Sequence, residues 1–320
     1  MTIPVHADFI PVSIALIGAG PRGESHGRAL SGVEHGTLSA VIDTDYQRAK
    51  ALGEALGVAI AHDINELCSE VQAVIVAVPT AQHYEVTKRC LQSGLHCLVE
   101  KPLCEEVWQA DELIALAEEK KLILQVGHIE RFNPAFIASR PYMTNPRYIE
   151  IHRLGPFDQR VAEVGVVLDL MIHDLDLVAS IVAAPLRSFS VFGAKVVSEH
   201  DDLVKCRLEY EDGCVVDLSA SRVSQQRSRT MRLFQADTYL SLDLDEMCAR
   251  IHRKLPASID HPPKIEQLSL PCSPANSFSL ALADFVACIG EGRRPLVGGQ
   301  EGREALALAK QIVATLLQQQ

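Results

Sequence analysis

Several features that mark particular protein classes are scarce or absent in this sequence. Aromatic residues make up only 5% of the 320 residues, so the core must depend on Ala, Val, Leu and Ile. No C-x-x-C pair occurs among the nine cysteines, so neither a zinc knuckle nor a disulfide framework is predicted. We therefore expect no metal site, and a cytoplasmic protein whose thiols remain reduced.

The sequence also lacks an excess of basic residues and a long apolar run. Lys and Arg number 30 against 41 Asp and Glu, which gives a formal net charge of −11. Because nucleic-acid binding needs a basic stripe, no nucleic-acid partner is predicted. The short basic stretches Arg227–Arg232 and Arg250–Lys254 are interpreted as solvated edges. No run of about 18 uncharged apolar residues exists and the N-terminus lacks a signal-peptide pattern, so no membrane span is expected.

The first 126 residues alternate short apolar runs with amphipathic stretches. The apolar runs predict strands at Ser13–Ile17, Thr37–Ile42, Ala73–Val78, His96–Val99 and Leu122–Val126. The amphipathic stretches predict helices at Ser25–Leu30, Tyr46–Leu56, Tyr84–Ser93 and Glu106–Lys120. Strands and helices in this rhythm indicate βαβ units, and hence an α/β domain with a doubly wound parallel sheet of the Rossmann type over residues 1–126.

After residue 126 the pattern changes to longer alternating runs, which are typical of an antiparallel sheet. Strands are predicted at Arg147–Arg153, Ser188–Val197, Leu203–Tyr210, Cys214–Ser221, Thr230–Gln235 and Thr238–Asp243. Helices are predicted at Val164–Val182, Phe278–Ile289 and Gly302–Leu317, and an exposed loop at Pro256–Ser277. Residues 127–320 are therefore expected to form an α+β domain with a large, mostly antiparallel sheet.

A glycine-rich turn follows the first predicted strand directly. The segment Gly18-Ala19-Gly20-Pro21-Arg22-Gly23 has the spacing G-x-G-x-x-G between a strand and a helix. The first glycine permits the tight turn, the second lets a pyrophosphate approach the backbone, and the third allows close packing of helix on strand. The free N–H groups of the helix then face the anion. The alternative is a tight turn that binds nothing.

The next strand ends in Asp43, 20 residues beyond Gly23. A carboxylate at this point accepts hydrogen bonds from ribose hydroxyls and repels a 2′-phosphate, which predicts NAD rather than NADP. Arg22 and Arg48 are nearby cations that would weaken this preference.

Two further segments follow predicted strands at the carboxyl edge of the sheet, where open α/β folds bind their ligands. The first contains Pro79, Thr80 and His83, and either lies beside the cofactor or, in the case of Thr80, caps a helix. The second is Glu100-Lys101-Pro102. An ammonium group at that edge would hold a substrate hydroxyl and stabilise developing negative charge, although most lysines are simply solvated.

A polar stripe runs through the apolar segment Gly165–Asp176. Asp169 and His173 are four residues apart and Asp176 lies three residues further on, so a helix places all three on one face. A buried histidine between carboxylates is costly unless it is hydrogen-bonded. The stripe is therefore either part of an active site or a satisfied polar cluster that ties the helix to the sheet; one histidine and two aspartates are thin support for a metal.

The ordered set G-A-G-P-R-G, E-K-P and D-x-x-x-H-x-x-D resembles the glucose–fructose oxidoreductase, inositol dehydrogenase and rhizopine-catabolism (Gfo/Idh/MocA) family over nearly the whole chain. The resemblance implies an NAD-dependent dehydrogenase in which Lys101, Asp169 and His173 are catalytic. Histidine can accept the proton of a secondary hydroxyl near neutral pH. Lys101 would stabilise the partial alkoxide, and Asp169 would stabilise the protonated imidazole or bind a neighbouring hydroxyl. Whether Lys101 or His173 is the final base stays open.

The segment Gly127–Pro134, with the sequence GHIERFNP, resembles one branch of that family. Members of that branch oxidise the 3-hydroxyl of UDP-N-acetylglucosamine for lipid A assembly, so a nucleotide sugar is the expected substrate. A diphosphate needs cations, and the candidates are Arg131, Arg153, Arg160 and Arg222. The predicted substrate-binding residues are His128, Arg131, Asn133, Asp176 and Arg222. The segment is otherwise a linker that anchors the second domain.

Two other functions stay open at this point. The first is an NAD-dependent dehydrogenase of a free sugar or a polyol such as inositol, and the second is a protein that senses NAD without turnover. The resemblance also implies a homodimer or homotetramer. The predicted cofactor-binding residues are Gly18, Gly20, Pro21, Arg22, Gly23, Asp43, Pro79, Thr80, His83, Glu100 and Lys101.

Overall fold

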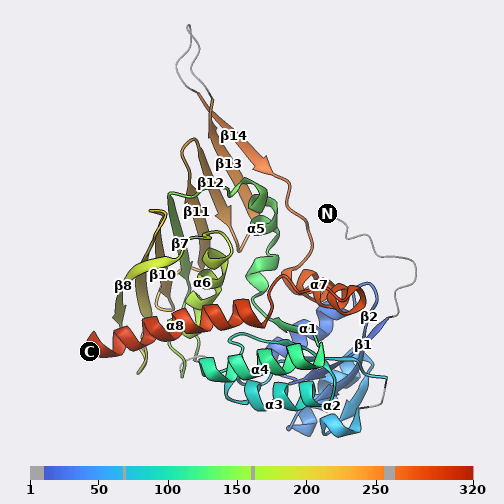
Figure 1. The fold of residues 1–320 in the computed structure, drawn as a ribbon. Helices are drawn as coiled ribbons and strands as arrows, with labels where there is room; N and C mark the ends of the chain where they lie inside the picture. Colours follow the sequence, from blue (N-terminus) through green and yellow to red (C-terminus); the bar gives the residue numbers. More distant parts are fainter. Residues whose placement is uncertain (1–10, 68–69, 160–162, 256–263, 320) are drawn as a thin grey trace. The chain divides into compact units, whose positions relative to one another are not determined.

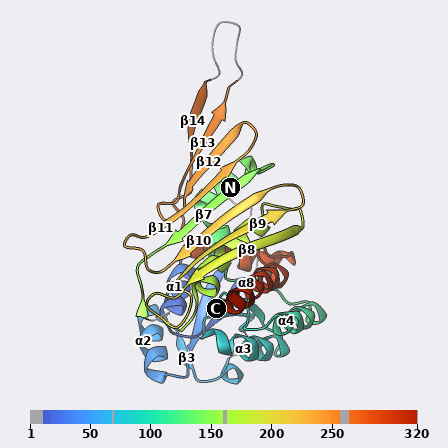
Figure 2. The ribbon, with the colours of Figure 1, turned by 90° about the vertical axis from the view of Figure 1, so that its left-hand side faces the viewer.

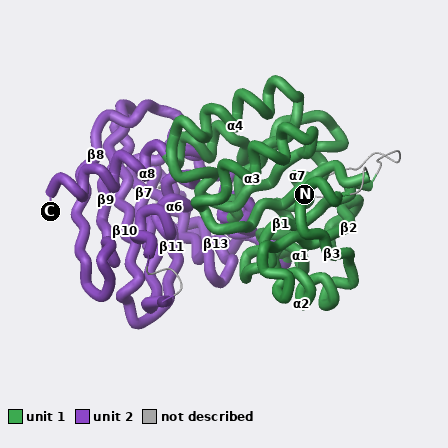
Figure 3. The backbone as a smooth tube through the Cα atoms, turned by 90° about the horizontal axis from the view of Figure 1, so that it is seen from below, with its two compact units in different colours: residues 1–129, 275–306 green, residues 130–274, 307–320 purple. Residues whose placement is uncertain are grey.

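The computed structural model describes residues 11–67, 70–159, 163–255 and 264–319 (Figure 1). The chain forms two compact units (Figure 3). Unit 1 comprises Met1–Ile129 and Ala275–Leu306, and unit 2 comprises Glu130–Pro274 and Ala307–Gln320. No helix among the described residues is long and apolar enough to cross a membrane.

Unit 1 contains a parallel sheet whose strand order is β3-β2-β1-β4-β5-β6. Its strands are β1 (Val12–Ile17), β2 (Gly36–Ile42), β3 (Ala59–Ala61), β4 (Ala73–Val76), β5 (His96–Val99) and β6 (Leu124–Val126). Its connecting helices are α1 (Pro21–Leu30), α2 (Tyr46–Leu56), α3 (Thr80–Gln92) and α4 (Val107–Lys120). Because the order reverses at β1, right-handed crossovers place α1 and α2 on one face and α3 and α4 on the other. The predicted doubly wound sheet is confirmed.

The core of unit 1 explains why a distant segment of the chain joins it. Buried aliphatic residues of the central strands, such as Leu16 and Ile75, form one cluster with Leu282 and Phe285 of α7 (Ser277–Glu291). These two α7 residues are 0% exposed. Residues 275–306 therefore belong to unit 1, whereas a division at residue 126 assigns them to the second domain. Helix α8 (Gly299–Gln319) contributes residues to both units.

Unit 2 contains a large sheet whose order is β14-β13-β12-β11-β7-β10-β9-β8 (Figure 2). Its strands are β7 (Tyr148–Leu154), β8 (Leu186–Ala194), β9 (Leu203–Tyr210), β10 (Val215–Ser221), β11 (Ser228–Phe234), β12 (Thr238–Asp243), β13 (Cys248–Lys254) and β14 (Ile265–Leu270). Among these strands β7 and β10 pair in parallel, and the other neighbours are antiparallel. The predicted mostly antiparallel sheet is confirmed.

One face of this sheet is buried and the other is not. In β9, Val204, Cys206 and Leu208 are buried, whereas Lys205 and Arg207 between them are exposed. Helix α5 (Pro134–Ser139) contacts β12, β13 and β14. The helix expected over 164–182 is a π-helical turn, Val167–Met171, which contacts β10, followed by α6 (Ile172–Ala179).

The loop predicted at Pro256–Ser277 is wrong in part. Residues 265–270 form β14 and pair with β13, and Ser277 begins α7, whereas residues 256–263 lie outside the described residues. Every residue of β14 is exposed or only half-buried, so this edge strand has no buried face whose pattern would distinguish it from a loop.

Candidate active site

The glycine-rich turn of unit 1 is built so that each glycine is needed for a different reason. Gly18 has a φ of +104°, and a Cβ there would lie 2.5 Å from the carbonyl oxygen of Ala77. A Cβ on Gly23 would lie 1.8 Å from the carbonyl oxygen of Gly18. A Cβ on Gly20 would meet nothing within 4 Å. The turn is thus packed at both ends and open in the middle, at the N-terminus of α1.

This open middle fits a dinucleotide. Gly20 is the N-cap of α1 and has no side chain to accept from the first N–H groups of the helix, and Pro21 takes the first helical position. Such a helix end attracts the negative charge of a pyrophosphate, and the open space at Gly20 lets the anion approach the backbone.

Asp43 stands directly after β2 and ties that strand to the turn. Its Oδ2 accepts a hydrogen bond from the backbone N–H of Ala19 at 2.7 Å, and its Oδ1 accepts from the N–H of Asp45 at 2.8 Å. These two bonds fix the carboxylate beside the glycine-rich turn, where the predicted ribose contact requires it.

The segment Glu100-Lys101-Pro102 follows β5, and its glutamate is buried. Glu100 is 5% exposed, and its Oε1 lies 2.6 Å from Nε2 of His26 on α1. Burial alone would raise the pKa of Glu100, but the hydrogen bond with His26 and the charges of His26, Arg22 and Lys101 outweigh burial and lower this pKa to about 2. Glu100 is therefore an ionised, buried carboxylate held by α1.

His83 lies on the other side of the same segment. Its Nδ1 is 2.7 Å from the carbonyl oxygen of Pro102, and its Nε2 is 2.9 Å from that of Val78. The side chain is 1% exposed, and burial lowers its pKa although both carbonyl contacts oppose this shift. Because both ring nitrogens contact backbone carbonyls, the geometry favours a role in positioning Pro102 over direct contact with a cofactor.

Thr80 is the first residue of α3, and Pro79 occupies the N-cap. The interpretation of Thr80 as the N-cap is therefore wrong. Pro79 and Thr80 still lie at the carboxyl edge of the sheet, because only residues 77 and 78 separate them from the end of β4.

In unit 2, the polar stripe lies on the π-helical turn and on α6. Asp169 belongs to the π-helical turn, and His173, which is 6% exposed, belongs to α6. Asp174, the neighbour of His173, contacts Arg153 of β7 through both carboxylate oxygens at 2.7–3.0 Å. Nη1 of Arg153 also lies 2.8 Å from Oε1 of Glu130. Strand β7 therefore anchors the helix that bears His173.

Besides Arg153, the same unit pairs two more of the arginines that the sequence offers for an anion. Nε of Arg131 donates to Oδ2 of Asp176 at 2.9 Å, and both residues are at least nine-tenths buried. Arg222 donates to Oδ1 of Asp202 at 2.7 Å and to the carbonyl oxygen of Val164. Arg160 lies outside the described residues. These ion pairs reduce the net positive charge that either guanidinium presents to a ligand.

Asn133 has a local structural role. Its Oδ1 accepts from the N–H of Ala135 and so caps α5, and its Nδ2 donates to the carbonyl oxygen of Leu244 at 2.8 Å. His128 is 0% exposed and belongs to unit 1.

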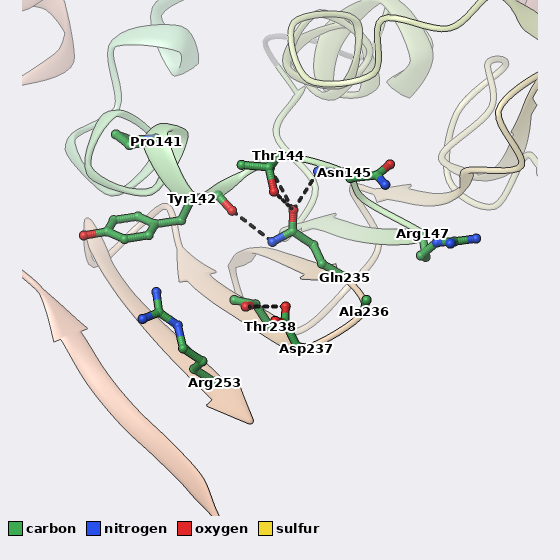
Figure 4. A pocket seen from close by; sticks show the side chains of 10 residues that line it. All are labelled: Pro141, Tyr142, Thr144, Asn145, Arg147, Gln235, Ala236, Asp237, Thr238 and Arg253. Atoms are coloured by element: carbon green, nitrogen blue, oxygen red, sulfur yellow. Dashed lines mark hydrogen bonds between the residues drawn. The ribbon is translucent and has the colours of Figure 1, made fainter. Parts of the chain in front are cut away.

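A surface pocket of unit 2 contains none of these candidates. Gln235 accepts from the N–H groups of Thr144 and Asn145 and donates to the carbonyl oxygen of Tyr142, so its amide holds the pocket wall together (Figure 4). The pocket lies beside Asn145 and Arg147, before the first residue of β7, whereas Arg153 is near the last residue of that strand. It is therefore distinct from the region of α6.

Comparison with known proteins decides the family. The model of the oxidoreductase family with an NAD-binding Rossmann fold, Gfo/Idh/MocA, matches residues 12–128, and the model of the Gfo/Idh/MocA C-terminal domain matches residues 139–238. The chain belongs to the Gfo/Idh/MocA oxidoreductase family. Its first domain is an NAD-binding Rossmann domain, and the resemblance seen in the motifs is confirmed.

Similar members of the Gfo/Idh/MocA family include two enzymes that match almost end to end. UDP-N-acetylglucosamine 3-dehydrogenase from Acidithiobacillus ferrooxidans is 31% identical over 305 residues, which cover 95% of this chain and 97% of that enzyme. A solved structure of that enzyme matches with a TM-score of 0.88 at 30% identity, over 95% of this chain and 97% of that chain. Inositol 2-dehydrogenase from Rhizobium meliloti is 24% identical over 95% of this chain and 97% of that enzyme.

Several residues of this Gfo/Idh/MocA chain contact the candidate site residues but were not identified from the sequence. His26 contacts Glu100 across 74 positions of the chain, and Asp174 contacts Arg153, one of the candidate cations, across 21. Oε1 of Glu130 accepts a hydrogen bond from Arg153 and another from Nη1 of Arg229, which lies 3.2 Å away. The sequence shows these residues only as polar side chains; that most of them are buried, and so need partners, follows from the fold.

Proposed function

We propose that this Gfo/Idh/MocA oxidoreductase is an NAD-dependent dehydrogenase that oxidises a secondary hydroxyl of a sugar. The first candidate substrate is a nucleotide sugar of the UDP-N-acetylglucosamine type, oxidised at its 3-hydroxyl. The single observation that carries this proposal is the 31% identity, over 95% of the chain, to UDP-N-acetylglucosamine 3-dehydrogenase.

The proposed catalytic residues are Lys101, Asp169 and His173. NAD, when bound, accepts the hydride that the substrate carbon loses. One of the two basic residues, Lys101 or His173, takes the hydroxyl proton, and general-base catalysis of this kind typically contributes about 10²–10⁴-fold. If His173 is the base, Lys101 as an ammonium orients the hydroxyl and stabilises its partial negative charge; if Lys101 is the base, it takes the proton as a neutral amine. Asp169 stabilises a protonated imidazole or binds a neighbouring hydroxyl.

For the cofactor, the proposed contacts are the glycine-rich turn with Pro21 and Arg22, and Asp43. The open space at Gly20 supports a pyrophosphate at the N-terminus of α1. Asp43, fixed by the N–H groups of Ala19 and Asp45, supports a ribose with free hydroxyls, and hence NAD rather than NADP.

For the substrate, the proposed contacts are His128, Arg131, Asn133, Asp176 and Arg222. Arg131 and Asp176 form an ion pair, which supports a different role for each of the two residues. Oδ1 of Asp176 is buried and has no hydrogen-bond partner among the described residues, so it remains available to accept from a sugar hydroxyl. Arg131 then holds Asp176 in place rather than acting as the main cation for a diphosphate.

The proposed division of labour follows the two units: unit 1 holds NAD, and unit 2 presents the substrate and mediates assembly into a homodimer or homotetramer. Exposed apolar side chains of unit 2, such as Phe192 of β8 and Ile265 of β14, support an assembly that covers them.

Oxidation of a free polyol is the second candidate function. It is favoured by the match to inositol 2-dehydrogenase over 95% of the chain, although the identity is only 24%. The two functions differ in whether the site must accept a diphosphate.

A substrate panel tests the proposal. The protein is mixed with NAD and, in turn, UDP-N-acetylglucosamine, UDP-glucose, myo-inositol and glucose, and NADH formation is followed at 340 nm. Turnover of a UDP-sugar at a higher kcat/KM than any free sugar supports the proposal. Turnover of inositol alone replaces it with the second candidate, and NAD binding without any turnover indicates a sensor.

A further inference from the structure

The turn that carries Lys101 is held from two sides by buried histidines. His26 of α1 contacts the side chain of Glu100, the residue before Lys101, and His83 of α3 contacts the main chain of Pro102, the residue after it. All these residues belong to unit 1. The side chain of His26 is 0% exposed and that of His83 1% exposed.

The contact of His26 with Glu100 has a defined donor. Glu100 is ionised, so its Oε1 can only accept, and Nε2 of His26 must carry the proton at 2.6 Å. The ring of His26 is fixed in turn by Phe278 of α7, which it meets edge-on at a centroid distance of 4.9 Å. Hydrogen bonds to an ionised acceptor are roughly twice as strong as neutral ones, so α1 holds Glu100 firmly.

Gly127 closes the other side of the Glu100 side chain. A Cβ at Gly127 would lie 3.1 Å from Cα of Glu100 and 3.3 Å from Oε1. The N–H of Gly127 donates to the carbonyl oxygen of Val99 at 2.7 Å, which keeps this backbone beside β5. The carboxylate thus has little room to move away from His26.

The contact of His83 with Pro102 fixes the far end of the turn. Its two ring nitrogens lie 2.7 Å and 2.9 Å from the carbonyl oxygens of Pro102 and Val78, so the ring connects the end of the turn to the segment after β4. Burial favours the neutral ring, which donates through one nitrogen only, and the tautomer with its proton on Nδ1 donates to the carbonyl oxygen of Pro102. An asparagine amide keeps a donor near Nδ1 and a glutamine amide a donor near Nε2, so the two positions can be tested separately.

We infer that His26 and His83 are positioning residues for Lys101, because they fix the turn on either side of it. The inference rests on the proposed function in so far as Lys101 is taken to be catalytic. Misplacement of a catalytic group by about 1 Å can cost about 10²-fold in rate, so loss of either contact lowers kcat while leaving the binding of NAD intact.

The first test compares kcat and the KM for NAD in matched variants. His26→Leu removes the donor to Glu100, and His26→Gln keeps an N–H near the position of Nε2. His83→Asn keeps an N–H near the position of Nδ1 and thus the contact with Pro102, whereas His83→Gln keeps only the contact with Val78. Thr87→Val, at an equally buried site one turn further along α3, is the control.

We expect His26→Leu and His83→Gln to lose about tenfold or more in kcat with the KM for NAD unchanged. His26→Gln and His83→Asn should stay within about threefold of the parent protein. Equal losses in His83→Asn and His83→Gln, or losses as large in Thr87→Val, would overturn the inference, because a purely structural role does not distinguish the two ring nitrogens.

A second test needs no substrate and keeps the inference separate from the proposed function. Amide hydrogen exchange of the peptide over residues 99–104 is measured with NADH present. Faster exchange of this peptide in His26→Leu and His83→Gln than in Thr87→Val supports the inference even where no sugar is oxidised, because exchange reports local opening. Exchange that is unchanged in both variants overturns it even where the sugar panel succeeds.

Discussion

Nη2 of Arg153 lies 2.7 Å from Oδ1 of Asp174, and Nε lies 3.0 Å from both oxygens of the same carboxylate. Arg153 is 2% exposed and Asp174 1%, so this contact is removed from water. Burial disfavours the charged guanidinium, but the carboxylates of Asp174 and Glu130 keep the pKa of Arg153 above its ordinary value. A charged arginine thus joins β7 to the residue that follows His173.

The first prediction is that Arg153→Met strongly destabilises the protein. The substitution leaves Asp174 and Glu130 as buried carboxylates that have lost their main cation, and removal of one partner of a buried pair costs about 3–5 kcal/mol. Urea unfolding of the variant measures this loss. Arg187→Met is the control, because its pair with Glu209 is exposed and such pairs contribute about 1 kcal/mol or less. Equal midpoints for the two variants would contradict the anchoring role.

The second prediction concerns the proposed catalytic residues. Lys101→Ala and His173→Ala should each lower kcat by orders of magnitude while the protein still binds NADH, because each removes a group proposed to act on the substrate hydroxyl and leaves the contacts proposed for the pyrophosphate and ribose in place. Steady-state rates and NADH fluorescence measure the two effects. Lys205→Ala and His62→Ala, at exposed positions, are the controls. Near-parental turnover in both site variants would remove Lys101 and His173 from the mechanism.

The third prediction concerns the choice between NAD and NADP. Asp43→Asn removes the negative charge that repels a 2′-phosphate, so the ratio of kcat/KM for NADP to that for NAD should rise by about tenfold or more. Asp45→Asn is a matched control, because Asp45 is two residues away and caps α2 through the N–H groups of Gln47 and Arg48. If the ratio changes equally in both variants, Asp43 does not select the cofactor.

The fourth prediction concerns acid stability. The pKa of Glu100 is about 2 in the folded protein against an ordinary value of 4.5, so its ionisation stabilises the fold above pH 4.5 and this stabilisation is lost as the pH falls toward 2. The full contribution is about 3 kcal/mol. Glu100→Gln should therefore lose more stability relative to the parent protein at pH 7 than at pH 3.5 in urea unfolding. A difference that is the same at both pH values would show that His26 does not hold an ionised Glu100.

Local patterns in the sequence predict most of the framework of this fold. Helix α2 and strands β5, β9 and β12 have the predicted bounds, because each is a short amphipathic or alternating run between turn residues. Strand β14 was not predicted, since an edge strand buries few side chains and so has little alternation to detect. The assignment of α7 to unit 1 depends on packing of Phe285 against distant strands, and no local pattern encodes it.

The candidate site was predictable where its residues act through the backbone, and less so where they act in pairs. Gly18, Gly20 and Gly23 are informative because each glycine is required by its own local geometry. Arg131 is an apparent free cation in the sequence, but Asp176 pairs with it from 45 positions away. Such partners are brought together by the tertiary fold, so a single sequence shows the charges without showing that they are neutralised.

The fifth prediction separates the two roles of the glycine-rich turn. Gly23→Ala places a methyl group 1.8 Å from the carbonyl oxygen of Gly18, so α1 or the turn must move, at a cost of about 3 kcal/mol or more. Gly20→Ala places its methyl group in open space at a φ of −76°, which alanine adopts readily, so stability should change by about 1 kcal/mol or less. The methyl group would nevertheless occupy the space proposed for the pyrophosphate, so the KM for NAD should rise by about tenfold or more.

Thermal unfolding and the KM for NAD, measured on both glycine variants, distinguish packing from binding at this turn. Gly32→Ala is the control, because Gly32 lies beyond the C-terminus of α1 and a Cβ there would approach only the carbonyl oxygen of Ala29, at 3.8 Å. A Gly20→Ala protein with parental stability and a parental KM would show that no part of the cofactor approaches the backbone at this position. The nearly unchanged stability expected for Gly20→Ala is what makes this result interpretable, because weaker binding then cannot be attributed to unfolding of α1.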